Sequence, residues 1–311
     1  MLGKTAGGLF WMFRYLERSE NTARLIETGF RIALTHPDGD EWKSVLQTAA
    51  ADMDYFAAHG EIDQSKVIDF LLRDKTNPSS VMSCIAQARQ NARLVRTSIT
   101  REVWEAVNDT FMRAKEVFAR PVRERDLPEV LALIRQQASL VRGELHGSML
   151  RNDVFDFARL GTFLERADNT ARILDVKYYV LLPSVTQVGS SLDNVQWETI
   201  LRSVSGVRSY AWLNQGKATP MGIADFLIFD PRMPRGLKYS MTKIRSNLQM
   251  LENSYADRHP CHDTAERLDR RLQTGKIEDV FDEGLHEFLT SFLGDIGKLG
   301  REIETDYRFH G

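Results

Sequence analysis

The sequence predicts an all-α protein, a helical bundle built from two duplicated halves that are related by a pseudo-twofold axis. Three observations support this prediction. Apolar residues recur at the three-to-four spacing of amphipathic helices, and a charged segment of thirteen residues occurs twice along the chain. No segment of four to eight residues shows the alternation of a strand bounded by turns.

Hydrophobic periodicity predicts the helices, which we take in chain order. Apolar residues mark the buried face of the helix that begins each half: Leu16, Ala23 and Ile26 in the first, then Leu164, Ala171 and Leu174 in the second. The same period predicts helices over 79–99, 100–118, 128–148, 234–253 and 280–304. Prolines are expected where helices end or begin, at positions 37, 78, 183, 220 and 234.

The duplicated segment is the strongest signal of internal repetition. Residues 15–27 read YLERSENTARLIE and residues 163–175 read FLERADNTARILD, with seven of thirteen positions identical. Three further blocks follow in the same order: EWKSVLQTAA (41–50) with QWETILRSVS (196–205), DFLLRDKTNP (69–78) with DFLIFDPRMP (225–234), and ARQNA (88–92) with IRSNL (244–248). Such a fixed order of matching blocks is typical of an internal repeat.

The spacing of these blocks predicts where the halves divide. The offset between matching positions is 148 in the first block and 155 to 156 in the others, and the loop VLLPSVTQVGSS (180–191) can hold the insertion. We therefore predict a first helical repeat over 1–148 and a second over 149–311. Because no Pro/Gly/Ser-rich linker separates them, we expect one shared core rather than two independent domains.

The composition is typical of a soluble globular protein, with 42% hydrophobic and 27% charged residues in 311. The 41 basic and 43 acidic side chains give no indication of nucleic-acid binding or of a basic membrane-binding surface. Two cysteines argue against a disulfide scaffold and against a cysteine-based zinc site. The N-terminus lacks the h-region of a signal peptide, so we expect a cytoplasmic protein.

Each copy of the duplicated segment gathers polar residues on one helix face, because residues three, four and seven apart lie together. Glu17, Glu20, Asn21 and Arg24 form what we call the first polar stripe, which Arg14 and Glu27 extend. Glu165, Asp168, Asn169 and Arg172 form the second polar stripe, which Asp175 extends. If a twofold axis relates the halves, the two stripes face each other across it.

Three interpretations of the stripes follow from their chemistry. They can form a buried ion-pair network, because buried charges need partners that offset desolvation. They can line a polar pocket, in which paired carboxylates act as acid and base or hold the amino groups of a ligand. A di-metal centre is the third, but the sequence has no Glu-x-x-His pair and sets an arginine beside each carboxylate. The first two do not exclude each other, and we expect no metal.

Other motifs indicate no cofactor and no further catalytic site. The sequence contains no Walker A motif, no G-x-G-x-x-G and no G-x-S-x-G, so neither a nucleotide cradle nor a serine elbow is predicted. Cys84 is predicted to be a buried structural thiol. The segment HPCHD (259–263) lacks two further ligands at a suitable spacing, so we predict a surface loop there rather than a zinc site.

The pairing of LERSENTAR with LERADNTARILDVKYYVLLPS resembles the alpha-E family of bacterial helical proteins. The segments QNARLVRTSITREVWEAVND (90–109), QWETILRSVSGVRSY (196–210) and DFLIFDPRMPRGLKYS (225–240) are similar to later blocks of that family. Two departures are visible. Gln90–Asn91 stands where the family pattern has Glu-Asn, and Pro234–Arg235–Gly236 stands where it has Pro-Arg-Ser.

The resemblance implies a function through gene context. Members of that family are encoded beside, or fused to, a circularly permuted ATP-grasp protein, often with a transglutaminase-like protease nearby. This implies a binding or scaffolding companion of an ATP-grasp-type peptide or amide ligase, with a small peptide or amino-acid-like ligand. The alternatives are an enzyme that acts on a small peptide or amide through Glu17 and Glu165, and a purely structural dimerising bundle.

The resemblance also implies candidate site residues. Carried onto this chain, the family glutamates are Glu17 and Glu165, and their polar neighbours are Arg18, Asn21, Arg24, Arg166, Asn169 and Arg172. Glu20 and Asp168 complete the stripes. The later matching blocks contribute three secondary candidates, Arg89, Asn91 and Arg235.

Overall fold

A computed structural model describes residues 1–34, 40–180, 191–214 and 218–310 of the chain. It is 79% helix, and no strand occurs among these residues. The prediction of an all-α fold is therefore confirmed. Among the described residues, no helix is both long enough and apolar enough to cross a membrane.

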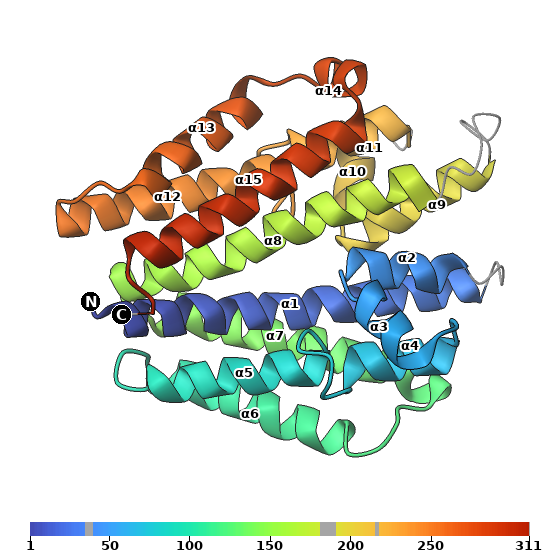
Figure 1. Cartoon of the computed structure of the whole chain (residues 1–311), viewed down its shortest axis with the longest axis horizontal. Coiled ribbons are helices and arrows are strands. Elements are labelled where there is room, and N and C mark those ends of the chain that lie inside the picture. The colour runs from blue at the N-terminus through green and yellow to red at the C-terminus, as the bar shows by residue number, and fades with distance from the viewer. Residues whose placement is uncertain (35–39, 181–190, 215–217, 311) are drawn as a thin grey trace.

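The chain forms long helices that run side by side, with shorter ones grouped toward one end (Figure 1). In order they are α1 (Gly3–Ala33), α2 (Asp40–Thr48), α3 (Asp52–His59), α4 (Gln64–Leu72), α5 (Val81–Leu94), α6 (Arg101–Val117), the 3-10 helix η1 (Glu124–Asp126), α7 (Leu127–Ser148), α8 (Asp153–Val180), α9 (Ser191–Ser203), α10 (Val207–Asn214), α11 (Pro220–Ile228), α12 (Leu237–Tyr255), α13 (Pro260–Thr274), α14 (Ile277–Glu283) and α15 (Leu285–Asp306).

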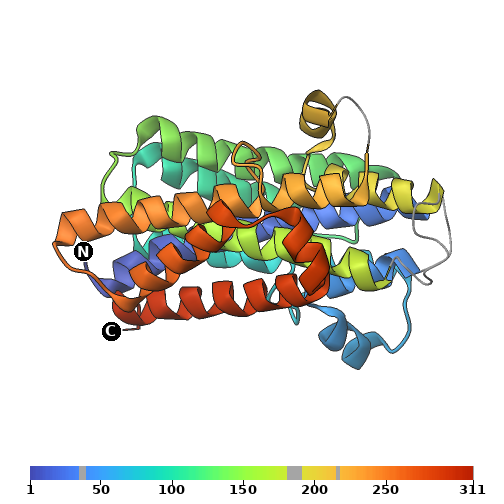
Figure 2. The same ribbon diagram turned by 90° about the horizontal axis from the view of Figure 1, so that it is seen from above.

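Helices α1 and α8 lie side by side at the centre of the bundle (Figure 1). On one side α1 packs against α5 and α7, and α6 packs on both of these. On the other side α8 packs against α12 and α15, and α13 packs on both of those. The two chain ends meet at one end of the bundle, as both views show (Figures 1 and 2). Because other helices surround α1 and α8, polar residues of both helices lie in the interior of the bundle.

A glycine sets the close approach of the central pair. A Cβ atom added at Gly161 of α8 would lie 2.1 Å from the carbonyl oxygen of Phe10 on α1. No side chain fits in that space, so the two backbones touch there. Phe10 itself is fully buried. This contact lies within two helical turns of Glu165 and brings the polar faces of α1 and α8 within reach of each other.

Most predicted helices agree with the structure to within three residues at each end, but two differ. The predicted helix over 79–99 is shorter, because Ser80 caps its start and the chain turns after Leu94 toward the Thr100 cap of α6. The predicted helix over 280–304 is two helices, α14 and α15. Gly284 separates them with a φ of +106°, a backbone conformation that glycine adopts far more readily than other residues.

The segment HPCHD is not a surface loop, so that prediction is wrong. His259 is the N-cap of α13, and Pro260 occupies its first turn, a position that proline favours. The side chains of Cys261 and His262 are buried in the core. Burial raises the pKa of the Cys261 thiol well above its usual value. Cys84 is fully buried, as predicted, and burial raises the pKa of its thiol to about 12.

The predicted proline positions are only partly described. Pro220 begins α11, and Pro78 and Pro234 each lie three residues before the first residue of α5 and α12. Pro37 and Pro183 lie outside the described residues, as do positions 181–190 of the predicted insertion loop.

Candidate functional site

Two reciprocal ion pairs join the polar stripes across the α1–α8 interface. Arg18 donates from Nε and Nη2 to the two carboxylate oxygens of Glu165, at 2.5 and 3.0 Å. Arg166 donates in the same way to Glu17, at 2.8 and 2.9 Å. Each pair joins an arginine of one helix to a glutamate of the other. Bidentate pairs of this kind are among the stronger charged contacts in proteins, so they fix the register of the two helices.

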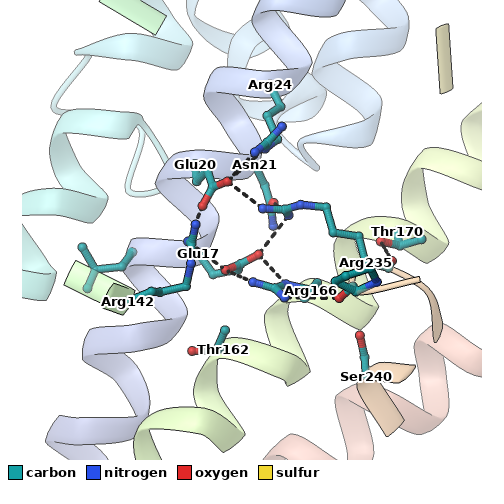
Figure 3. A network of polar contacts seen from close by, with 12 residues as sticks. Glu17, Glu20, Asn21, Arg24, Arg142, Thr162, Arg166, Thr170, Arg235 and Ser240 are labelled. Atoms are coloured by element: carbon teal, nitrogen blue, oxygen red, sulfur yellow. Dashed lines mark hydrogen bonds and ion pairs between the residues drawn. The ribbon is translucent and has the colours of Figure 1, made fainter. Parts of the chain in front are cut away.

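Arg235 reaches the first polar stripe from the turn between α11 and α12 (Figure 3). Its Nη1 donates to Glu17 Oε1 at 3.0 Å and to Asn21 Oδ1 at 2.9 Å, and its Nη2 donates to Glu20 Oε1 at 2.6 Å. The turn is tied to α8, because Thr170 Oγ1 donates to the Arg235 carbonyl oxygen at 2.7 Å. One guanidinium thus contacts three residues of α1.

Two more arginines complete the environment of Glu20. Arg142 on α7 donates to the Glu20 carboxylate and, at 3.4 Å, to Glu17 Oε2. Arg24, one turn further along α1, donates to Glu20 Oε1 at 2.7 Å. The side chains of Glu17 and Glu20 are at most 1% exposed. Both carboxylates therefore have several charged partners and almost no contact with solvent, as a buried ion-pair network requires.

The second polar stripe is less densely paired. Glu165 also accepts from Arg14, whose Nη2 lies 2.9 Å from Glu165 Oε2. Asp168 pairs with Arg172 of the same helix, with Nε 2.8 Å from Oδ2. Within the part of the chain that is described, no charged group from another helix approaches Asp168 within hydrogen-bond distance.

A cavity of about 160 Å³ lies between the two stripes. Its walls are Arg18, Asn21, Thr22, Leu25, Thr48, Ala49, Ala50, Ser79, Glu165, Asp168, Asn169 and Arg172. The side chains of Asp168 and Arg172 are 23% and 36% exposed, so the cavity opens to solvent on their side. The Nδ2 atom of Asn21 is buried and has no hydrogen-bond partner among the described residues.

The arginines keep both central glutamates ionised. Burial by itself would raise the pKa of Glu17, but the nearby Arg166 and Arg235 guanidinium groups outweigh it and hold that pKa well below the usual range. Burial likewise opposes a low pKa at Glu165, yet Arg18 and Arg14 lower it to about 2. A general acid or base works best with a pKa near the operating pH. Neither carboxylate is tuned for that role.

The low pKa of Glu165 predicts a loss of stability in acid. Its usual value is 4.5 and its value in the folded protein is about 2. A lowered carboxylate pKa stabilises the folded state fully above the unfolded value, and this stabilisation disappears as the pH falls through the folded value. We expect the free energy of unfolding, measured by urea titration, to decrease steadily from pH 4.5 to pH 2. The decrease should be smaller in Glu165→Gln, and an equal decrease in both proteins would contradict the assignment.

The structure divides the sequence candidates into three groups. The cavity is lined by Arg18, Asn21, Glu165, Asp168, Asn169 and Arg172. The network beside it contains Glu17, Glu20, Arg24, Arg166 and Arg235. Two secondary candidates, Arg89 and Asn91, lie on α5 and do not line the cavity. Arg89 donates to Asn108 Oδ1 of α6 at 2.9 Å, which makes it a contact between those two helices.

Sequence reasoning missed Arg142 and Ser79. Arg142 lies in α7, outside every matching block, so no pattern connected it to the glutamates. Ser79 directly follows the block that ends at Pro78 and matches Arg235 at the same offset of 156. Extending that block by one residue would have found it. Among the described residues, no three histidine, cysteine, aspartate or glutamate side chains are grouped as metal ligands.

Comparison with known proteins relates nearly the whole chain to one family. A family model described as a predicted alpha-helical domain with a conserved ER motif matches residues 1–307. An uncharacterized protein of Mycobacterium bovis is 26% identical over 325 aligned positions, which cover 95% of this chain and 35% of the relative. Two uncharacterized proteins of Mycobacterium tuberculosis strains match with the same identity and coverage. The chain spans about a third of the length of these curated relatives. No solved structure matches it.

Proposed function

The chain belongs to the Alpha-E family, and from this premise we propose that it is a binding companion of an ATP-grasp-type peptide or amide ligase. In this role it holds a small peptide or amino-acid-like ligand in the cavity between the two polar stripes. The partner supplies ATP chemistry, and this chain supplies binding and orientation.

The cavity beside a paired network is the observation that carries this proposal. Both stripes contribute to its walls, so the ligand would lie between α1 and α8 in contact with charged and amide groups. Glu17 and Glu165 are held by arginines and have low pKa values. Such a site can orient a polar ligand through preformed charges, but neither of these two carboxylates exchanges protons near neutral pH. Binding therefore fits these residues better than acid–base catalysis.

The lengths of the relatives support a partner. In each of the three mycobacterial proteins the matched part is 35% of a longer chain. In these relatives the matched segment is joined to further protein, and this supports a protein partner for the chain described here. Trp212 at the end of α10 is 92% exposed, and large aromatic side chains are frequent anchors of protein interfaces. We place the ligase-binding surface around Trp212.

A duplication of the two halves is part of the same proposal. The two ER dipeptides of the central helices exchange partners, since Arg18 pairs with Glu165 and Arg166 pairs with Glu17. Matching aromatic pairs also have similar geometry. The rings of Tyr55 and Phe70 lie 5.4 Å apart at 73°, and those of Tyr210 and Phe226 lie 5.5 Å apart at 73°. These four residues match at offsets of 155 and 156.

Co-purification tests the partner. We expect an affinity-tagged chain to retain an ATP-grasp-type ligase encoded beside its gene when the two are co-expressed. Trp212→Ser should weaken the complex by roughly tenfold or more, because an interface tryptophan often contributes 2 kcal/mol or more. Met53→Ser is the matched control, since Met53 is 82% exposed on α3. Absence of a complex both with and without ATP would refute the companion role.

A further inference from the structure

We propose that the cavity between the stripes binds a guanidinium group. The chain supplies such a group at the corresponding place beside the first polar stripe, where the Arg235 guanidinium group contacts that stripe. The inference rests on the proposed ligand-binding function and on the proposed duplication, and it names the chemical class of the ligand.

The cavity beside the second stripe corresponds to the space that Arg235 fills beside the first stripe. Ser79 matches Arg235 at an offset of 156, and Ala50 matches Ser205 at an offset of 155. Ala50 and Ser205 have the same unusual backbone conformation, with φ of 51° and 56°. Around the first stripe, Arg24 Nη1 donates to Ser205 Oγ at 2.5 Å. Around the second stripe, the shorter Ser79 and Ala50 line the cavity instead.

The acceptors that hold Arg235 have counterparts in the cavity wall. Arg235 donates to the side chains of Glu17, Glu20 and Asn21. At the offset of 148, these match Glu165, Asp168 and Asn169, all three of which line the cavity. A guanidinium group in the cavity would contact two carboxylates and an amide of the second stripe, as Arg235 contacts two carboxylates and an amide of the first stripe.

The two stripes differ by one guanidinium group. The first stripe has two carboxylates, Glu17 and Glu20, in contact with four guanidinium groups, those of Arg24, Arg142, Arg166 and Arg235. The second has two carboxylates, Glu165 and Asp168, in contact with three, those of Arg14, Arg18 and Arg172. One bound guanidinium group would bring the second stripe to the same balance as the first.

One further feature of the cavity favours a positively charged occupant, and another favours a water bound beside it. The C-terminal end of α2 forms part of the wall through Thr48 and Ala49, and the partial negative charge at a helix C-terminus attracts cations. Asn21 is 3% exposed, and its Nδ2 has no partner among the described residues. This Nδ2 is a donor, and a guanidinium group carries donors only, so we expect a bound water to accept from Nδ2 beside the ligand.

The size of the cavity limits the bound part of the ligand. At about 160 Å³ it is smaller than the roughly 300–1,000 Å³ of pockets that enclose a whole drug-sized molecule. It therefore suits one functional group at the end of a chain. Because the cavity opens beside Asp168 and Arg172, the rest of the ligand can extend into solvent. Free arginine and an arginine side chain of a peptide both meet this description.

Calorimetric titration of the full chain tests the inference. The probes are methylguanidine, L-arginine and a short peptide with one central arginine, each at constant ionic strength, with methylamine as the ammonium comparison. We expect saturable binding of methylguanidine, and weaker binding of methylamine because an ammonium lacks the planar fork of donors. Tighter binding of the peptide than of L-arginine would identify a peptide as the source of the group, and the reverse would identify free arginine.

A variant whose own side chain fills the cavity gives the most direct test of guanidinium binding. Ser79→Arg restores the residue found at the matching position and should abolish methylguanidine binding. Ser254→Arg, at an exposed site near the end of α12, should bind as the wild type does. If Ser79→Arg fails to fold, Asp168→Asn serves, with binding weakened by roughly tenfold or more through loss of a charged hydrogen bond.

Three results would overturn the inference: no saturable binding to the wild type, equal binding to Ser79→Arg, or methylamine binding as tightly as methylguanidine. None of these bears on the ligase complex, which is measured separately by co-purification. Loss of that complex with guanidinium binding intact would refute the companion role alone.

Discussion

Replacing Glu17 by glutamine is expected to lower the free energy of unfolding by about 3–5 kcal/mol, the cost of removing one partner from a buried charge network. The Glu17 carboxylate accepts from Arg166 and Arg235 and is 1% exposed. Glutamine keeps the size of the side chain but removes its charge, and its amide nitrogen faces donors instead of accepting from them. The two guanidinium groups stay buried with one carboxylate fewer. Urea titration followed by circular dichroism measures the loss.

The matched control is Glu105→Gln on α6. Glu105 pairs with Arg101 one turn away, and both side chains are more than half exposed. Exposed pairs of this kind contribute little to stability because water and salt screen them. We therefore expect Glu105→Gln to unfold almost as the wild type does. If Glu17→Gln were no less stable than the control, the network would not hold the central helices together.

Replacing Gly161 by alanine is expected to have the second largest effect, a loss of about 1–3 kcal/mol through overpacking. The added methyl group would lie 2.1 Å from the Phe10 carbonyl oxygen, and backbone cannot move aside as a flexible side chain can. The helices α1 and α8 would have to separate. Because the Arg18–Glu165 and Arg166–Glu17 pairs span that interface, their geometry would worsen as well.

Gly143→Ala is the matched control for this substitution. Gly143 lies inside α7, and a Cβ atom there has no neighbour within 4 Å. Alanine has the higher helix propensity, so this variant should be more stable than the wild type by about 0.5–1 kcal/mol. The two substitutions are chemically identical, but Gly161→Ala should lower the melting temperature and Gly143→Ala should raise it. Equal effects would show that α1 and α8 can separate without cost.

Local signals were sufficient to predict several of the long helices. The three-to-four period placed α6, α7 and α12 within three residues, because each has one face against the core and one toward solvent. Periodicity did not reveal the break at Gly284, since the apolar spacing continues through α14 and α15. The surface loop predicted at HPCHD rested only on the absence of further metal ligands at a suitable spacing, and Pro260 instead begins a helix whose Cys261 and His262 are buried.

The candidate site was predictable only in part, because the sequence pattern shows contacts within one helix but not contacts between distant helices. The stripes could be read from the sequence because Glu17, Glu20 and their neighbours lie on one helix at fixed spacing. Arg142 and the contacts of Arg235 could not, because they come from helices and turns more than a hundred residues away. Position along the chain carries no information on which distant side chain faces a given carboxylate.

The sequence by itself determined the helical class, the repeated charged segment and the residues that form each stripe. These follow from spacing within single helices, where the 3.6-residue period decides which side chains share a face. The tertiary structure alone decided that the carboxylates of YLERSENTARLIE pair with arginines from α7, α8 and the turn before α12, while the carboxylates of Glu165 and Asp168 border an open cavity. Under the proposed duplication, that difference depends on whether Arg235 or Ser79 stands at the matching turn, because the length of one side chain determines whether the space beside buried carboxylates is filled.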